Sequence, residues 1–178
     1  MVNHDNKNNN YRNNLNMNRE LFVGPQQNVK PEWIDHNGHM NVAFYLVAFD
    51  DSIGSLFRFL GLDRKYRESH KVATYCGDFH IRYVRELHEG DPLTITTQLI
   101  SCDEKRVHLC QSMFHENEGY LAAQSEVIYL HIDLQTKRVG PMGAELFARI
   151  KAMCNAHSVL PKPSNLGRLI GKPVVRNR

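Results

Sequence analysis

The sequence lacks the patterns that mark a disulfide scaffold, a zinc ribbon or a membrane protein. Its four cysteines form no C-x-x-C pair and show no regular spacing, so we expect free thiols. No uncharged apolar run approaches the roughly 18 residues that a membrane-spanning helix requires. The N-terminus has no apolar block of the kind found in signal peptides. These absences predict a cytoplasmic protein without a membrane partner.

Positive charge is also scarce in most of the chain. The net charge is +3 over 178 residues, yet residues 161–178 contain five cations and no acid, so residues 1–160 are slightly acidic. Nucleic-acid binding needs a dense cationic face that displaces counterions from phosphates. We therefore expect no nucleic-acid partner for the folded part of the chain.

The two ends of the chain differ in composition from its centre. Residues 1–18 contain nine asparagines and few apolar residues, too few to offset the entropy of ordering. Residues 161–178 combine cations with proline and glycine, which indicates an extended tail. The composition, with 42% hydrophobic and 23% charged residues and no internal repeat, predicts one globular domain over residues 19–160 between a disordered leader and a basic tail.

One long amphipathic helix is predicted between Asn41 and Leu60. Its apolar residues recur at spacings of three and four while its other side is polar, which is typical of a helix with one buried face. The apolar face comprises Val42, Tyr45, Leu46, Phe49, Ile53, Leu56, Phe57 and Leu60. Asn41 is the expected N-cap, and Gly61 should end the helix.

Strands are predicted on both sides of this helix in the sequence. A first strand should span residues 21–29, and after the helix apolar and polar residues alternate with the period of two that half-buried strands show. The later strands are expected at residues 79–83, 93–99, 107–113 and 120–134, the last with both faces buried. Short polar turns favour an antiparallel meander, and a final helix is expected at residues 144–154. The expected fold is α+β, an antiparallel sheet of about five strands wrapped around one long helix.

Signatures of several common enzyme sites are missing. The chain has no G-x-S-x-G nucleophile elbow, no G-x-x-x-x-G-K-[ST] phosphate loop, no H-E-x-x-H zinc helix and no G-x-G-x-x-G dinucleotide turn. The sequence therefore argues against a serine hydrolase.

A polar cluster at the start of the long helix carries the strongest functional signal. Residues 33–41 read W-I-D-H-N-G-H-M-N and are followed by V-A-F-Y-L. This order resembles the hotdog-fold acyl-CoA thioesterases of the 4-hydroxybenzoyl-CoA thioesterase type, and the match continues through residues 80–87 and covers roughly residues 20–155. The resemblance implies a hotdog fold, hydrolysis of an acyl-CoA thioester to the acid and coenzyme A, and no cofactor.

The same cluster also resembles a subgroup of that family. The segment P-E-W-I-D-H-N-G-H-M-N is similar to betainyl-CoA thioesterases, although residues 41–44 read N-V-A-F, where that subgroup has Thr-Glu. The sequence therefore does not identify the acyl group of the substrate.

By position, the resemblance makes Asp35 the catalytic carboxylate. A carboxylate next to a thioester carbonyl can deprotonate a water molecule or attack directly to form a mixed anhydride, and the sequence does not choose between the two. The alternative is that Asp35 only caps a turn before the helix.

The remaining site residues follow from the same resemblance. The backbone amide of Val42, seven residues after the carboxylate, should polarise the carbonyl at the helix N-terminus. Gly38 would let the backbone turn beside the substrate or serve as an ordinary turn glycine. Asn41 is favoured as the helix cap and is a candidate substrate contact, and Tyr45 is favoured as a core residue over lining of the acyl pocket.

Two histidines flank Asp35 and raise the question of a metal. His39 is expected to orient the loop or to hydrogen-bond near the substrate. A site made of His36, Asp35 and His39 is disfavoured because three ligands within five residues cannot easily surround one ion. We therefore expect no metal site.

Cations near the mouth of the site would help to bind the phosphates of coenzyme A. Arg82 and Arg85 are the nearest candidates on a predicted strand, with solvated strand residues as the alternative. Arg168 and Lys172 of the tail are further candidates.

The predicted sheet also leaves an edge strand that can pair with a second copy. The resemblance implies a homodimer or homotetramer whose site lies at the interface, with residues 74–78 of the other copy as candidates to complete it.

Two rival functions are a hotdog hydratase, whose pattern has one more residue between acid and histidine, and a non-catalytic acyl-CoA-binding module.

Overall fold

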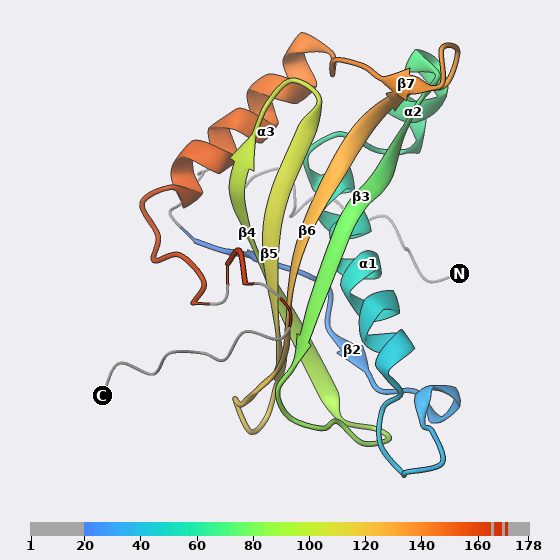
Figure 1. The fold of residues 1–178 in the computed structure, drawn as a ribbon, viewed down its shortest axis with the longest axis vertical. Helices are drawn as coiled ribbons and strands as arrows, with labels where there is room; N and C mark the ends of the chain where they lie inside the picture. Colours follow the sequence, from blue (N-terminus) through green and yellow to red (C-terminus); the bar gives the residue numbers. More distant parts are fainter. Residues whose placement is uncertain (1–19, 165, 169, 171–178) are drawn as a thin grey trace, which may run out of the picture.

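The computed structural model describes residues 20–164, 166–168 and 170, and these form a sheet with three α-helices (Figure 1). In chain order the elements are β1 (Phe22–Val23), β2 (Gln27–Asn28), the 3-10 helix η1 (Pro31–Trp33), α1 (Val42–Phe59), α2 (Arg64–His70), β3 (Val72–Tyr83), β4 (Pro92–Cys102), β5 (Arg106–His115), β6 (Leu121–Asp133), β7 (Arg138–Val139) and α3 (Ala144–His157). The predicted leader lies outside the described residues, as does most of the tail. No helix in the described ranges is long and apolar enough to cross a membrane.

The sheet is antiparallel, with the strand order β1-β4-β5-β6-β3, while β2 also pairs with β4 and β7 with β6. The predicted meander is correct for β4, β5 and β6, but β3 pairs with β6 and not with β4. Residues 84–91 therefore cross from β3 at one edge of the sheet to β4, which lies on the far side of β5 and β6. They do so by burying Leu87 completely, and its carbonyl accepts a hydrogen bond from the Met40 N–H at 2.7 Å. A short polar turn was thus wrongly interpreted as a hairpin.

The first predicted strand is two short strands. Both β1 and β2 pair with β4, and the break falls at Gly24 and Pro25. Gly24 lies so close to α1 that an added Cβ would be 2.4 Å from the Ser52 hydroxyl oxygen. Pro25 has no N–H to donate to a neighbouring strand. Tight packing and proline together interrupt the strand.

Helix α1 agrees with its prediction to one residue at each end. The Asn41 side chain accepts a hydrogen bond from the Ala43 N–H, which confirms the cap. The helix has 18 residues and is therefore about 27 Å long. Its buried residues are Tyr45, Ala48, Phe49, Ser52, Ile53, Leu56 and Phe57. This face holds α1 against the sheet and sets the position of its N-terminus.

Three other elements differ from expectation. Helix α2 was not predicted, because none of its residues is buried and it therefore has no apolar periodicity; its ends are set by the Asp63 cap and by Lys71, whose φ is +53°. Strand β3 starts seven residues earlier than expected, since a bulge between Cys76 and Asp78 breaks the alternation. Strand β6 has one buried face and one half-buried face instead of two buried faces.

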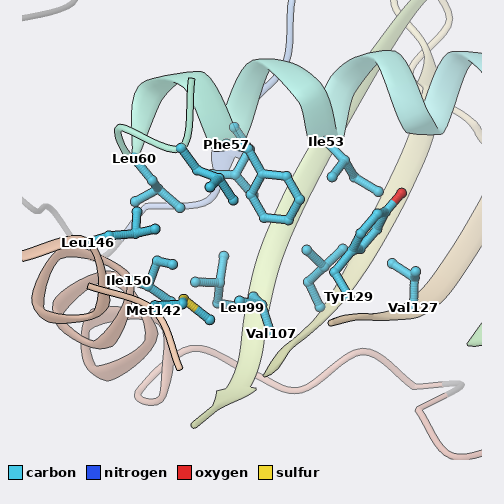
Figure 2. Packing of buried hydrophobic residues seen from close by; sticks show 13 residues of the cluster. Ile53, Phe57, Leu60, Leu99, Val107, Val127, Tyr129, Met142, Leu146 and Ile150 are labelled. Atoms are coloured by element: carbon cyan, nitrogen blue, oxygen red, sulfur yellow. The ribbon is translucent and has the colours of Figure 1, made fainter. Parts of the chain in front are cut away.

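The hydrophobic core continues from α1 to α3. Figure 2 shows one of its clusters, in which Phe57 of α1 and Leu60 at its C-terminal cap face Leu146 and Ile150 of α3 across residues from the sheet. A second cluster around Trp33, Met40 and Phe49 lies under the N-terminal half of α1. Both ends of the long helix are therefore anchored.

Candidate active site

The segment before α1 is a closed loop. Ile34 and Met40 form an isolated antiparallel bridge, and the Asp35 N–H donates to the His39 carbonyl at 3.1 Å. The Gly38 N–H donates back to the Asp35 carbonyl at 3.0 Å, and Gly38 has a φ of +83°, which favours glycine. The polar cluster of the sequence thus forms one compact turn.

Asp35 lies half-buried in this loop. Its Oδ1 accepts a hydrogen bond from the Asn37 N–H at 2.7 Å, which is the turn-forming role given by the alternative interpretation. Its Oδ2 receives no hydrogen bond from the residues that the structure describes. The carboxylate therefore holds its own turn with one oxygen and leaves the other available.

The loop ends at Asn41, the N-cap of α1. The Asn41 N–H donates to the Trp33 carbonyl at 2.9 Å, while the Asn41 side chain takes the Ala43 N–H at 3.0 Å. The Val42 N–H has no acceptor in the described part of the chain. An unpaired amide at the positive end of an 18-residue helix therefore lies at the same end of α1 as Asp35.

His39 lies near a carboxylate outside the loop and is not part of a metal-binding cluster among the described residues. Its Nε2 is 3.9 Å from a carboxylate oxygen of Glu86, in the connection between β3 and β4. His36 is exposed. Within the described ranges no group of three or more His, Cys, Asp and Glu side chains could hold a metal ion.

Two tyrosines support the first turn of α1. Tyr45 is buried, and its burial raises the pKa of its hydroxyl to about 12. Its ring is edge-on to Tyr83 at 5.2 Å between ring centroids. The Tyr83 hydroxyl donates to the Val42 carbonyl at 3.1 Å. Sequence reasoning missed Tyr83, because only the path of β3 beside α1 brings this hydroxyl to the site.

Among the described residues, neither arginine candidate contacts Asp35. Arg82 alternates with Phe79 and Ile81, which pack on the core, so its side chain is on the sheet face away from α1. Arg85 lies over the ring of Tyr120, with 3.9 Å between guanidinium carbon and ring centroid. Neither is brought into the loop of Asp35 by this chain alone.

Arg168, the described tail candidate, also lies on the face away from α1. It lines a hollow of about 340 Å³ with Asp78, His80, His108 and Glu126. The Gly167 N–H donates to Glu126 at 2.7 Å, and His108 contacts the other oxygen of that carboxylate at 2.9 Å. The beginning of the tail is thereby fastened to the back of the sheet. Lys172 lies outside the described residues.

The site is open on the side of β3. This strand pairs with β6 only, and its other edge has no neighbour in the described ranges. Exposed apolar residues line this edge, among them Val42, Leu46, Tyr75 and Tyr83. A half-buried carboxylate therefore precedes a free helix amide that lies beside this open edge. Such a pair can activate water or attack a carbonyl carbon while the amide polarises the carbonyl oxygen.

Comparison with known proteins finds similar thioesterases. Residues 29–150 match the thioesterase-like superfamily. The chain is 36% identical to the betainyl-CoA thioesterase of Pseudomonas aeruginosa over 83% of this chain and 93% of that protein. It is 28% identical to FadM, a long-chain acyl-CoA thioesterase of Escherichia coli, over 72% of this chain and 96% of that protein.

A solved structure supports the same assignment. A Staphylococcus aureus protein in complex with CoA superposes with a TM-score of 0.81 and 30% identity, covering 88% of this chain and 98% of that one. These matches confirm the expected hotdog fold and a thioester-hydrolysing enzyme. The chain belongs to the thioesterase-like superfamily.

Proposed function

We propose that the chain hydrolyses an acyl-CoA thioester to the free acid and coenzyme A, with Asp35 as the catalytic carboxylate. One observation carries the proposal: a half-buried carboxylate with one free oxygen precedes the unpaired Val42 amide at the start of α1. The names of the similar proteins support the same reaction.

The chemistry needs two steps from this pair of groups. The Val42 N–H stabilises the negative charge that develops on the carbonyl oxygen. As a base, Asp35 takes a proton from water, whose oxygen attacks the carbonyl carbon; the C–S bond then breaks and coenzyme A leaves as a thiol after it gains a proton. As a nucleophile, Asp35 attacks the carbonyl carbon, the C–S bond breaks to release the coenzyme A thiolate, and water then hydrolyses the resulting anhydride to the free acid and the Asp35 carboxylate. The geometry supports either route.

The other candidates have supporting roles in the proposal. Gly38 and Asn41 shape the loop and the helix start, and His39 orients the loop through Glu86. Tyr45 supports Tyr83 beneath the site. Arg82 and Arg85 would bind the phosphates of coenzyme A, which lie at the other end of its pantetheine arm from the thioester at Asp35.

A homo-oligomer completes the proposed site. The free edge of β3 and the exposed apolar residues beside it support pairing with another copy, as a dimer or as a tetramer of two dimers. Residues 74–78 of the second copy would then approach the first turn of α1.

We place this enzyme in the cytoplasm.

The acyl group is the least constrained part of the proposal. Similar proteins are named for a betainyl and for a long-chain acyl-CoA, and a related structure holds CoA. A substrate survey is therefore part of the test.

The decisive variant is Asp35→Asn. The amide oxygen of Asn keeps an acceptor for the Asn37 N–H, so the turn survives while the base or nucleophile is lost. We expect kcat/KM to fall at least about 100-fold, within the range that a general base contributes. Release of the CoA thiol from short, branched, long, aromatic and betainyl thioesters measures it. Asp63→Asn, which keeps the acceptor of the α2 cap, is the matched control.

Three outcomes separate the rivals. Full activity of Asp35→Asn would remove this residue from the mechanism. CoA binding by calorimetry without thiol release from any ester would favour the binding module. Hydration of an enoyl-CoA, followed by loss of its conjugated absorbance, would favour the hydratase.

A further inference from the structure

Helix α1 and strand β3 run side by side along the open edge (Figure 1). At one end the Tyr83 hydroxyl bonds to the Val42 carbonyl at 3.1 Å. Further along, Asp50 of α1 is close enough to Cys76 of β3 to contribute, after burial, to a raised pKa of that thiol. Val42 and Asp50 therefore both lie on the side of α1 that is next to β3.

This side of the helix is apolar until it reaches Asp50. Val42, Leu46 and Val47 are 59%, 43% and 42% exposed. Between Val42 and Asp50, the exposed residues are valine, alanine and leucine, and Asp50 is the first charge. An acyl chain whose carbonyl is held at the Val42 amide would therefore meet apolar side chains first and a carboxylate beyond them.

Asp50 is held in place by a buried group. The Tyr129 hydroxyl donates to Asp50 Oδ1 at 2.6 Å, and Figure 2 shows this hydroxyl pointing toward α1. Tyr129 is only 7% exposed and packs edge-on against Phe57 at 5.3 Å between ring centroids. The carboxylate is therefore fixed in direction by a rigid tyrosine.

No cation compensates this carboxylate. Among the described residues, no Lys, Arg or His is within salt-bridge distance of Asp50. In a single copy, water solvates it. A second copy on β3 would remove that water, and a carboxylate that is buried without a cation or sufficient hydrogen bonds is costly. A positive charge on the acyl group would offset that cost.

The spacing suits a short acyl group. Asp50 lies eight positions after Val42, a rise of about 12 Å along the helix. Helical side chains tilt toward the N-terminus, which shortens the gap between the Val42 amide and the Asp50 carboxylate. A cationic group a few atoms beyond the thioester carbonyl can reach into this gap.

We propose that Asp50, held by Tyr129, is a specificity-determining residue that selects acyl groups carrying a cation, such as a quaternary ammonium. This inference rests on the proposed thioesterase function. It assigns Asp50 to recognition of the acyl group and leaves the reacting carbonyl to Asp35 and Val42.

Pairs of esters that differ only in charge test the inference. Betainyl-CoA has a neutral isostere, tert-butylacetyl-CoA, in which carbon replaces nitrogen; γ-butyrobetainyl-CoA and its tert-butyl isostere place the same groups further from the carbonyl. We expect the wild-type protein to favour the cationic member of at least one pair ten-fold or more in kcat/KM. In Asp50→Asn this ratio should fall at least ten-fold, and Tyr129→Phe should reduce it in part.

The control is Asp51→Asn, which removes the same charge one position along on a different side of α1 and should keep the ratio. Equal losses on charged and neutral esters in Asp50→Asn would overturn the inference, as would a wild-type protein without preference for a cation. Neither result touches the proposed function, because both require hydrolysis. Absence of hydrolysis of all esters, including the broader survey above, would remove the proposed function and this inference with it.

Discussion

Val42 contributes to the proposed site through its backbone, so an ordinary side-chain substitution cannot test it. Val42→Pro can, because proline has no N–H and is favoured at the first position of a helix. Asn41 already has the extended conformation that a residue before proline requires, with a φ of −64° and a ψ of 142°. The helix should therefore persist without the amide.

We expect Val42→Pro to lower kcat at least about 100-fold, the usual effect of removing one oxyanion donor. Thiol-release kinetics measure this loss, and circular dichroism and thermal unfolding check that α1 is retained. Val42→Ala keeps the N–H and serves as the control. Equal activity of the proline and alanine variants would show that the amide does not polarise the carbonyl.

At the scale of elements, a histidine fastens the end of α3 to the sheet. His157 is buried; its Nδ1 accepts from the Leu99 N–H at 2.9 Å and its Nε2 contacts the Glu20 carbonyl at 3.0 Å. These partners require the neutral ring with the proton on Nε2, because a protonated Nδ1 could not accept. Burial lowers the pKa of His157 below its ordinary value of 6.5.

The unfolded chain therefore binds a proton more readily than the folded chain. The contribution of His157 to stability is complete above pH 6.5 and is lost as the pH falls toward the lower pKa of the folded state. His131, whose pKa is also lowered by burial, adds to the same trend. We expect the free energy of unfolding in urea to fall between pH 7.5 and pH 5, pH values chosen about one unit or more on each side of the ordinary histidine pKa.

His157→Gln should reduce this pH dependence and lower stability at pH 7.5 by about 2 kcal/mol, since it leaves the Leu99 N–H or the Glu20 carbonyl without its partner. His36→Gln, at an exposed position in the loop before α1, is the control. An unchanged pH slope in His157→Gln would contradict the assignment.

The elements show where sequence reasoning succeeds. Helix α1 and strands β4 and β5 were predicted because each buries one face, and burial of one face leaves a period in the sequence, while β6 was predicted from its longer apolar run. Helix α2 buries nothing and so leaves no period. The pairing of β3 with β6 could not be predicted, because periodicity shows that a strand is half-buried and does not show which strand lies beside it.

The candidate site follows the same division. Asp35, Gly38, Asn41 and Val42 all lie in the short segment 35–42, so their loop could be predicted from local sequence and from the family resemblance. Tyr83 and Asp50 join the site only because α1 lies along β3, and Asp50 also depends on a tyrosine 79 residues further along the chain. Residues that topology alone brings together leave no local signal.

At the scale of the whole molecule, one chain has an unfinished edge. Tyr75 on β3 is 55% exposed and lies in the stretch proposed to approach the site of a second copy. A glutamate there would place a charge against its own symmetry mate or against an apolar surface, and an unpaired charge in an interface is costly. Tyr75→Glu should therefore separate the copies without disturbing the core of either one.

We expect light scattering to show an oligomer for the wild-type protein and a single chain for Tyr75→Glu at the same concentration, with thiol release falling in parallel. Val159→Glu adds the same charge at a 60% exposed position just after α3, beside the opposite edge of the sheet, and should change neither mass nor activity. If Tyr75→Glu separates the copies but retains full activity, one chain holds a complete site, and the proposed contribution of residues 74–78 from a second copy is wrong. If the mass is unchanged, β3 does not form the interface. If mass and activity fall together, the free edge of β3 is part of the enzyme's catalytic architecture, since a neighbour on that edge would cover the exposed side of α1 between Val42 and Asp50.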